Sequence, residues 1–237
     1  MDKLSQMRLQ GMKQALQTYL ETPGVYSPEE LIAHLADAEW LARNNQKQER
    51  LRRNARFRYQ VQISDLDFDT PRGLDKSMIL HLAGGAFIQQ GQDVLITGPT
   101  GVGKSHLVSA LGHQACNLGY KTLYFNLRKL LATLRAAMAD GTYLKLIAKI
   151  EKHDLLIIDD FGLQPLDANA RHILLELIED RHQKRSTIVA SQLPVSKWYD
   201  VIGDSVVADA ILDRLVHNAH RIELKGESWR KRAAGNR

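Results

Sequence analysis

Apolar residues in the first part of the chain recur at helical spacing, which predicts an all-helical N-terminal module at residues 1–62. A first helix is expected over residues 1–21, ending at the helix breaker TPG at residues 22–24. The segment SPEE at residues 27–30 then combines a serine N-cap, a proline at the first helical position and a glutamate at the third. This combination is a capping box. The second helix is therefore expected to begin there and to run to about Tyr59.

From residue 63 onward, short apolar runs alternate with stretches of helical spacing, which is the pattern of an α/β domain with a parallel sheet. The runs that predict strands cover residues 93–97, 121–125, 155–158, 187–190 and 221–224. The stretches that predict helices cover residues 75–86, 105–116, 127–139, 142–152, 167–184 and 206–218. Residues 63–237 are thus expected to form one domain in which helices flank a parallel sheet.

The strand at residues 93–97 and the helix that follows it enclose GPTGVGKS at residues 98–105, a complete match to the phosphate-binding motif GxxxxGK(S/T). Its glycines let backbone N–H groups point at an anion, and the helix adds its positive end. Lys104 supplies a mobile charge for the β and γ phosphates, and the Ser105 hydroxyl is placed to ligate Mg²⁺. The flanking strand and helix favour a true phosphate loop over a chance match, so we expect ATP and Mg²⁺ as cofactors. The residues expected to contact the nucleotide are Gly98, Pro99, Thr100, Gly101, Val102, Gly103, Lys104, Ser105 and His106.

The second half of the expected site is the segment LLIIDDFG at residues 155–162, where two carboxylates follow a buried strand. Asp159 is the expected Mg²⁺ partner, acting through water. Asp160 would orient or deprotonate the attacking water, although it could instead be a helix cap or a salt-bridge partner. The next strand ends in Ser191 and Gln192, which would hydrogen-bond the attacking water or the γ phosphate, unless they only form the turn that follows.

Charge adds a second expected ligand. The 237 residues include 32 Lys and Arg against 27 Asp and Glu, which gives a net charge of +5 and favours a polyanionic partner besides the nucleotide. Residues 43–58 hold seven Lys or Arg and one acid, Glu49. This stretch is either a solvated helix face or a contact surface for phosphate backbone, with Arg50 and Arg53 as the candidate DNA contacts.

The hydropathy of the chain indicates the cellular compartment in which we expect the protein. Hydrophobic residues make up 44% of the chain, enough for a core, and the single cysteine, Cys116, is expected inside it. No run of about 18 apolar residues occurs, and the first ten residues lack the apolar region of a signal peptide. We therefore expect a cytoplasmic protein with no membrane partner.

Several strings together resemble a known family. GPTGVGKS, LLIIDDFG, STIVASQLP and ILDRLVHN, in this order and spacing, resemble the AAA+ ATPases of the initiator and helicase-loader clade. The strings FDTPRGL at 68–74, VSKW at 195–198, LDRLVHNA at 212–219 and GESWRKR at 226–232 are more specifically similar to the IstB family of insertion-sequence transposition helpers. The resemblance covers essentially the whole chain. It implies an ATP-hydrolysing AAA+ core of the P-loop class after a helical module, with the C-terminal lid reduced or absent.

The resemblance also implies roles for individual residues. Lys104 and Ser105 match the phosphate-loop pair, Asp159 the magnesium carboxylate and Asp160 the second acidic position. Ser191 or Gln192 matches the first sensor. The catalytic residues that the resemblance implies are Asp160, Lys104, Arg214, Ser191 and Gln192. The metal ligands that it implies are Ser105 and Asp159.

Arg214 matches the arginine finger, which acts on the nucleotide of a neighbouring subunit; otherwise it would form a salt bridge with Asp213 or Asp209 on the helix surface. Arg230 or Arg232 would replace the second sensor arginine that lid-bearing relatives carry.

The function implied is an ATP-dependent helper that oligomerises on duplex target DNA and recruits and stimulates a transposase, with hydrolysis controlling assembly and disassembly. The alternatives are a replicative-helicase loader and a small-molecule kinase. The resemblance implies DNA contacts by a helical insertion that carries Arg128, Lys129, Arg135 and Lys145. Because no base-reading motif is visible, we expect salt-dependent contacts with phosphates.

Overall fold

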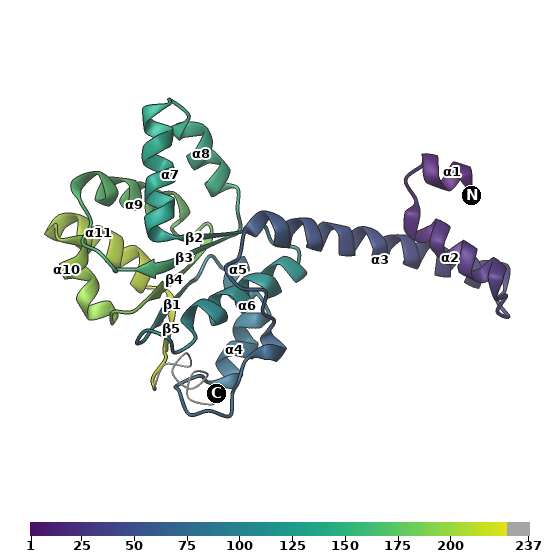
Figure 1. The fold of residues 1–237 in the computed structure, drawn as a ribbon, viewed down its shortest axis with the longest axis horizontal. Coiled ribbons are helices and arrows are strands. Elements are labelled where there is room, and N and C mark those ends of the chain that lie inside the picture. The colour runs from purple at the N-terminus through teal and green to yellow at the C-terminus, as the bar shows by residue number, and fades with distance from the viewer. Residues whose placement is uncertain (227–237) are drawn as a thin grey trace, which may run out of the picture. The chain divides into compact units, whose positions relative to one another are not determined.

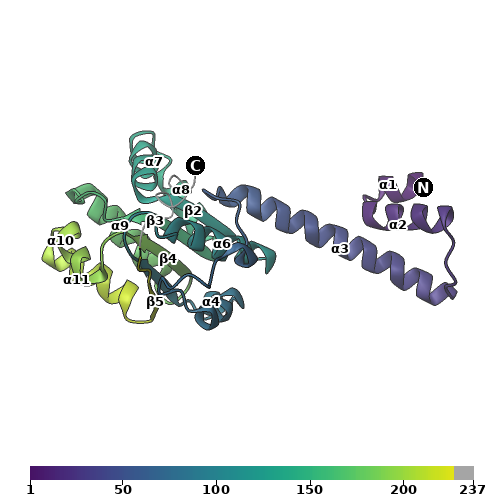
Figure 2. The ribbon, with the colours of Figure 1, turned by 60° about the horizontal axis from the view of Figure 1, so that its bottom comes forward.

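The computed structural model describes residues 1–226 (Figures 1 and 2). The chain divides into two compact units, Met1–Arg50 and Leu51–Arg237. Residues 51–62 lie in the second unit, although they were predicted to belong to the helical module.

The first unit is built from helices, which run over α1 (Asp2–Gln6), α2 (Gln10–Glu21) and most of α3 (Pro28–Ala55). The single helix predicted over residues 1–21 is interrupted, since Arg8 has a left-handed backbone with φ 58°. The predicted capping box is confirmed: Ser27 N–H donates to Glu30 Oε2 over 2.8 Å, and Glu30 N–H donates to Ser27 Oγ over 3.2 Å. The helix α3 ends earlier than expected, because Arg56 is also left-handed, with φ 59°.

A glycine sets the distance between α2 and α3. A Cβ on Gly11 would lie 2.4 Å from the Ala38 carbonyl oxygen, closer than atoms can pack. Next to this contact, Glu39 Oε2 accepts from the Met12 N–H over 3.1 Å, and Glu39 Oε1 pairs with Arg43 over 2.7 Å. Burying this carboxylate is tolerated because both of its oxygens have donors.

The second unit contains a five-stranded parallel sheet, which confirms the predicted fold class. The strands are β1 (Asp93–Thr97), β2 (Thr122–Asn126), β3 (Leu155–Phe161), β4 (Ser186–Ser191) and β5 (Ala219–Glu223), in the order β2-β3-β4-β1-β5. All five predicted strands are present, with ends that differ by a few residues. Because the strands are parallel, their carboxyl ends lie at one edge, where such sheets bind ligands.

Helices cover both faces of this sheet (Figures 1 and 2). They are α4 (Lys76–Ala83), α5 (Ala86–Gln89), α6 (Lys104–Asn117), α7 (Leu127–Ala139), α8 (Tyr143–Glu151), α9 (Ala168–Arg181), α10 (Trp198–Ile202) and α11 (Ser205–Val216), with short 3₁₀ turns at Ile63–Asp65 and Val195–Lys197. The helix predicted over residues 75–86 is divided in two, because Gly85 has φ 80°. The short helix α10 was not predicted.

Two hydrophobic clusters hold the layers together, and alternate strand residues contribute to each. Val94 and Ile96 of β1 belong to the cluster that also contains residues of α4, α5, α6 and the end of α3. Leu95 belongs to the other cluster, which contains residues of α7 to α11. Cys116 is fully buried, as predicted. Within residues 1–226, no helix combines the length and apolarity that crossing a bilayer requires.

Candidate functional site

The loop between β1 and α6 requires glycine at several of its positions. Gly98 and Gly103 have φ values of 145° and 101°, in the region that favours glycine. A Cβ on Gly98 would lie 2.2 Å from the Leu224 carbonyl oxygen, so a side chain is excluded there. The loop enters α6 at Lys104, which gives the strand–loop–helix order that the motif needs.

The Lys104 ammonium is held against this loop. Its Nζ donates to the carbonyl oxygens of Gly98 over 2.7 Å and of Pro99 over 2.8 Å, and only 7% of the residue is exposed. Burial lowers the pKa of Lys104, while the nearby charges of Asp159 and Asp160 oppose that change. The charge expected for phosphate binding is thus placed near both carboxylates.

Asp159 is fixed by two hydrogen bonds at the end of β3. Its Oδ2 accepts from the Tyr124 hydroxyl over 2.6 Å and its Oδ1 from the Asp160 N–H over 2.8 Å, while the residue is 1% exposed. Burial and the charge of Asp159 raise the pKa of Tyr124, so the phenol stays protonated and remains a donor. Ser105, half-buried in the first turn of α6, is the other candidate metal ligand. A fixed carboxylate and a hydroxyl on a phosphate loop fit Mg²⁺, which takes few protein ligands besides phosphates and water.

Asp160 occupies a bulge in β3. The register between β3 and β4 shifts between Ile158 and Phe161, and Asp160 has a left-handed backbone with φ 58°. Its Oδ2 accepts from Asn126 Nδ2 over 2.7 Å and pairs with Arg58 Nη1 over 3.3 Å. A strained backbone at a strand end is typical of functional positions.

Ser191 and Gln192 point to different neighbours. The Ser191 hydroxyl is fully buried, donates to the Phe161 carbonyl over 2.8 Å and accepts from the Leu193 N–H over 3.0 Å. Gln192 Oε1 instead accepts from the Thr100 hydroxyl of the phosphate loop over 2.5 Å. Of the two candidates for the first sensor, Gln192 is therefore the one in contact with the loop.

Three residues near the site were not identified from the sequence. Arg72, within the string FDTPRGL, donates to the Val102 carbonyl over 3.3 Å and to the Asp67 carbonyl over 2.7 Å, so it supports the phosphate loop from the side. Tyr124 and Asn126 hold the two carboxylates. Only Asn126 carried a visible signal, as a polar residue at the carboxyl end of a predicted strand.

Arg214 lies on α11 and contacts α9. Its Nη2 pairs with Glu179 Oε2 over 2.5 Å, and its Nη1 donates to the Ala210 carbonyl over 2.8 Å. The ion-pair partner is thus Glu179 and not the Asp213 or Asp209 considered from the sequence. Arg230 and Arg232 lie outside the described residues.

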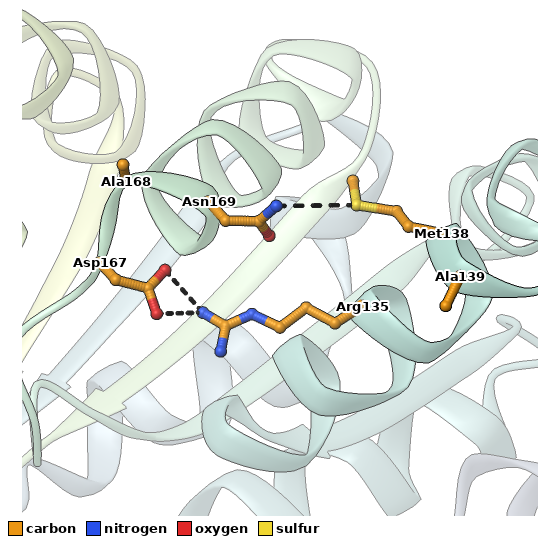
Figure 3. Close-up of a pocket in the computed structure, with 6 residues that line it drawn as sticks. All are labelled: Arg135, Met138, Ala139, Asp167, Ala168 and Asn169. Carbon is orange, nitrogen blue, oxygen red and sulfur yellow. Dashed lines mark hydrogen bonds and ion pairs between the residues drawn. The ribbon is translucent and has the colours of Figure 1, made fainter.

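The six basic residues expected to contact DNA are all exposed: Arg50, Arg53, Arg128, Lys129, Arg135 and Lys145. Arg128 and Lys129 lie in the first turn of α7, where the helix dipole disfavours cations. Arg135 pairs with Asp167, the N-cap of α9, with nitrogen–oxygen distances of 2.6 and 2.7 Å at the edge of a pocket between α7 and α9 (Figure 3). This ion pair holds the Arg135 side chain against the start of α9.

Comparison with known proteins identifies relatives along the whole chain. The family model described as IstB-like ATP binding protein matches residues 2–236. The chain is 45% identical over 233 residues to a Sinorhizobium fredii protein named as insertion sequence ATP-binding protein y4pL, covering 98% of this chain and 95% of that protein. It is 31% identical over 237 residues to a Pseudomonas aeruginosa protein named for insertion sequence IS21 and ATP binding, covering 98% and 89%.

Solved structures share the fold. The DnaC helicase loader aligns with a TM-score of 0.57 at 20% identity, over 66% of this chain and 95% of that chain. The replication initiator DnaA, bound to AMPPCP and single-stranded DNA, aligns with a TM-score of 0.55 at 20% identity, over 68% and 52%. These likenesses confirm the predicted fold, in which helices flank a parallel sheet.

Proposed function

The chain belongs to the family of IstB-like ATP binding proteins, and from this premise we propose that it is an ATP-dependent helper of transposition. In this proposal several copies assemble on duplex target DNA with ATP bound, and the assembly recruits and stimulates a partner transposase. ATP hydrolysis then controls disassembly.

The observation that carries the proposal is the gathering of Lys104, Asp159, Asp160 and Gln192 at the carboxyl edge of one parallel sheet. Lys104 would neutralise the β and γ phosphates. Asp160 would orient the attacking water and accept its proton, while Gln192 would hydrogen-bond the water or the γ phosphate. Ser105 and Asp159 would hold Mg²⁺, whose charge stabilises the transferred phosphoryl group.

Assembly would complete this site. An arginine supplied by a neighbouring protomer stabilises transition-state charge only when protomers meet, and we assign that role to Arg214. The exposed cations of α7, placed against their helix dipole, would bind the DNA phosphates.

The test is the rate of ATP hydrolysis per protomer, measured against protein concentration with and without duplex DNA. We expect the rate per protomer to rise with concentration and with duplex DNA, and to be abolished in Lys104→Ala. A rate that is independent of concentration and of DNA would instead favour a self-contained enzyme such as a small-molecule kinase.

A further inference from the structure

The connector that follows α3, at residues 56–59, contacts α6 through two aromatic side chains. The Phe57 ring is 9% exposed and lies 4.3 Å from the His113 ring, measured between centroids. The Tyr59 ring stacks on His106 with centroids 4.0 Å apart and planes 20° apart. The Tyr59 carbonyl oxygen also lies 3.2 Å from His113 Nε2. The backbone on both sides of Arg58 is therefore held in place.

This anchoring directs Arg58 to the bulge in β3. Arg58 Nη1 lies 3.3 Å from Asp160 Oδ2, and its guanidinium carbon lies 5.5 Å from the centroid of the Tyr59 ring. The same Asp160 oxygen accepts from Asn126 Nδ2. A carboxylate oxygen has about two acceptor sites, so Arg58 and Asn126 together occupy Oδ2 and fix the orientation of the whole group.

We propose that Arg58 is a positioning residue that restrains Asp160 and thereby lowers the basal rate of ATP hydrolysis. The proposal rests on the proposed role of Asp160 in hydrolysis. While the guanidinium is paired with the carboxylate, it competes with the attacking water for the same group. Because Arg58 comes three residues after the end of α3, an event that moves the end of this helix would move Arg58 with it.

The experiment compares steady-state hydrolysis by Arg58→Gln and wild type without DNA. We expect kcat to rise about two- to fivefold, the range that one exposed ion pair produces, with the KM for ATP unchanged. Arg56→Gln is the matched control, because it removes the same charge from an exposed side chain of the same connector. It is expected to hydrolyse ATP at the wild-type rate. A kcat for Arg58→Gln at or below that of wild type would overturn the proposal.

Asp160→Asn separates this proposal from the one on which it rests. If Asp160→Asn hydrolyses ATP like wild type, the proposed role of Asp160 is wrong. If Asp160→Asn is inactive and Arg58→Gln does not raise kcat, only the role of Arg58 is wrong. In the double variant we expect the low rate of Asp160→Asn, because the carboxylate that Arg58 restrains is gone. A double variant faster than Asp160→Asn would contradict restraint through this carboxylate.

Discussion

The Tyr124 hydroxyl donates a 2.6 Å hydrogen bond to Asp159 Oδ2, which links neighbouring strands at the carboxyl edge of the sheet. The phenol orients the carboxylate that we assign to Mg²⁺. Groups that orient a metal ligand in this way typically change metal affinity by ten- to a hundredfold when they are removed.

Tyr124→Phe is therefore expected to raise the Mg²⁺ concentration for half-maximal hydrolysis about tenfold, because Asp159 loses its donor. A magnesium titration of the hydrolysis rate measures this shift. Tyr143→Phe is the matched control, since it removes a phenol–carboxylate hydrogen bond, to Glu176, between α8 and α9. Equal shifts in the two variants would show that Tyr124 does not act on the metal ligand.

Substitutions of Ser191 and Gln192 are expected to have different effects, the first on stability and the second on activity. Ser191→Ala removes a buried hydroxyl with two partners and should lower the free energy of unfolding by about 1–2 kcal/mol. Gln192→Ala should leave stability unchanged and lower kcat about tenfold, the effect of one hydrogen bond. Denaturant unfolding and hydrolysis measured on both variants check this. The reverse pattern would assign the sensor role to Ser191.

The sequence was sufficient for the phosphate loop and the acidic strand, because each is a local pattern. A glycine-rich loop with its lysine, and two carboxylates after four apolar residues, can be recognised without knowing their neighbours. The contacts of Arg58 with Asp160 and of Arg72 with the Val102 carbonyl could not be predicted, since these partners lie 102 and 30 positions away. Choosing between Ser191 and Gln192 likewise required knowing that Thr100 comes near β4.

The interruption of one helix and the presence of a short helix could not be predicted from the sequence pattern either. The helix predicted over residues 1–21 is interrupted at Arg8, a residue type that gives no turn signal. The helix α10 is only five residues long, too short for hydrophobic periodicity to show. It is fixed instead by Trp198, fully buried and 4.5 Å from the Phe161 ring between centroids.

Arg214→Ala should reduce hydrolysis in the assembled state by about a thousandfold if the guanidinium acts on a neighbour's nucleotide. Glu179→Gln removes the same ion pair and keeps the arginine, so it should stay within a few-fold of wild type. Hydrolysis is measured at a protein concentration and DNA content that support assembly. Equal losses of ATP hydrolysis in both variants would show that Arg214 acts only as a partner in an ion pair with Glu179.

Asp93 is expected to make stability depend on pH. Burial raises the pKa of Asp93 to about 7, although the Thr187 N–H and the charge of Arg181 oppose this shift. The pKa of an unfolded aspartate is about 3.9. The contribution of Asp93 to the free energy of unfolding is therefore complete below about pH 4 and is lost as pH rises through about 7. Asp93→Asn keeps an acceptor for Thr187, so relative to wild type it should gain on the order of 4 kcal/mol of unfolding free energy between about pH 4 and pH 8. Urea unfolding of both proteins across this pH range measures the gain. A difference in unfolding free energy that does not change with pH would contradict the prediction.

The central claim is ATP-dependent assembly on duplex DNA. It is tested most directly by binding the purified chain to labelled duplex and single-stranded DNA with ATP, ADP or a non-hydrolysable ATP analogue, while light scattering reports mass. We expect large assemblies on duplex DNA with ATP or the analogue, and none with ADP. Equal duplex binding in every nucleotide state, or a preference for single strands, would contradict the claim.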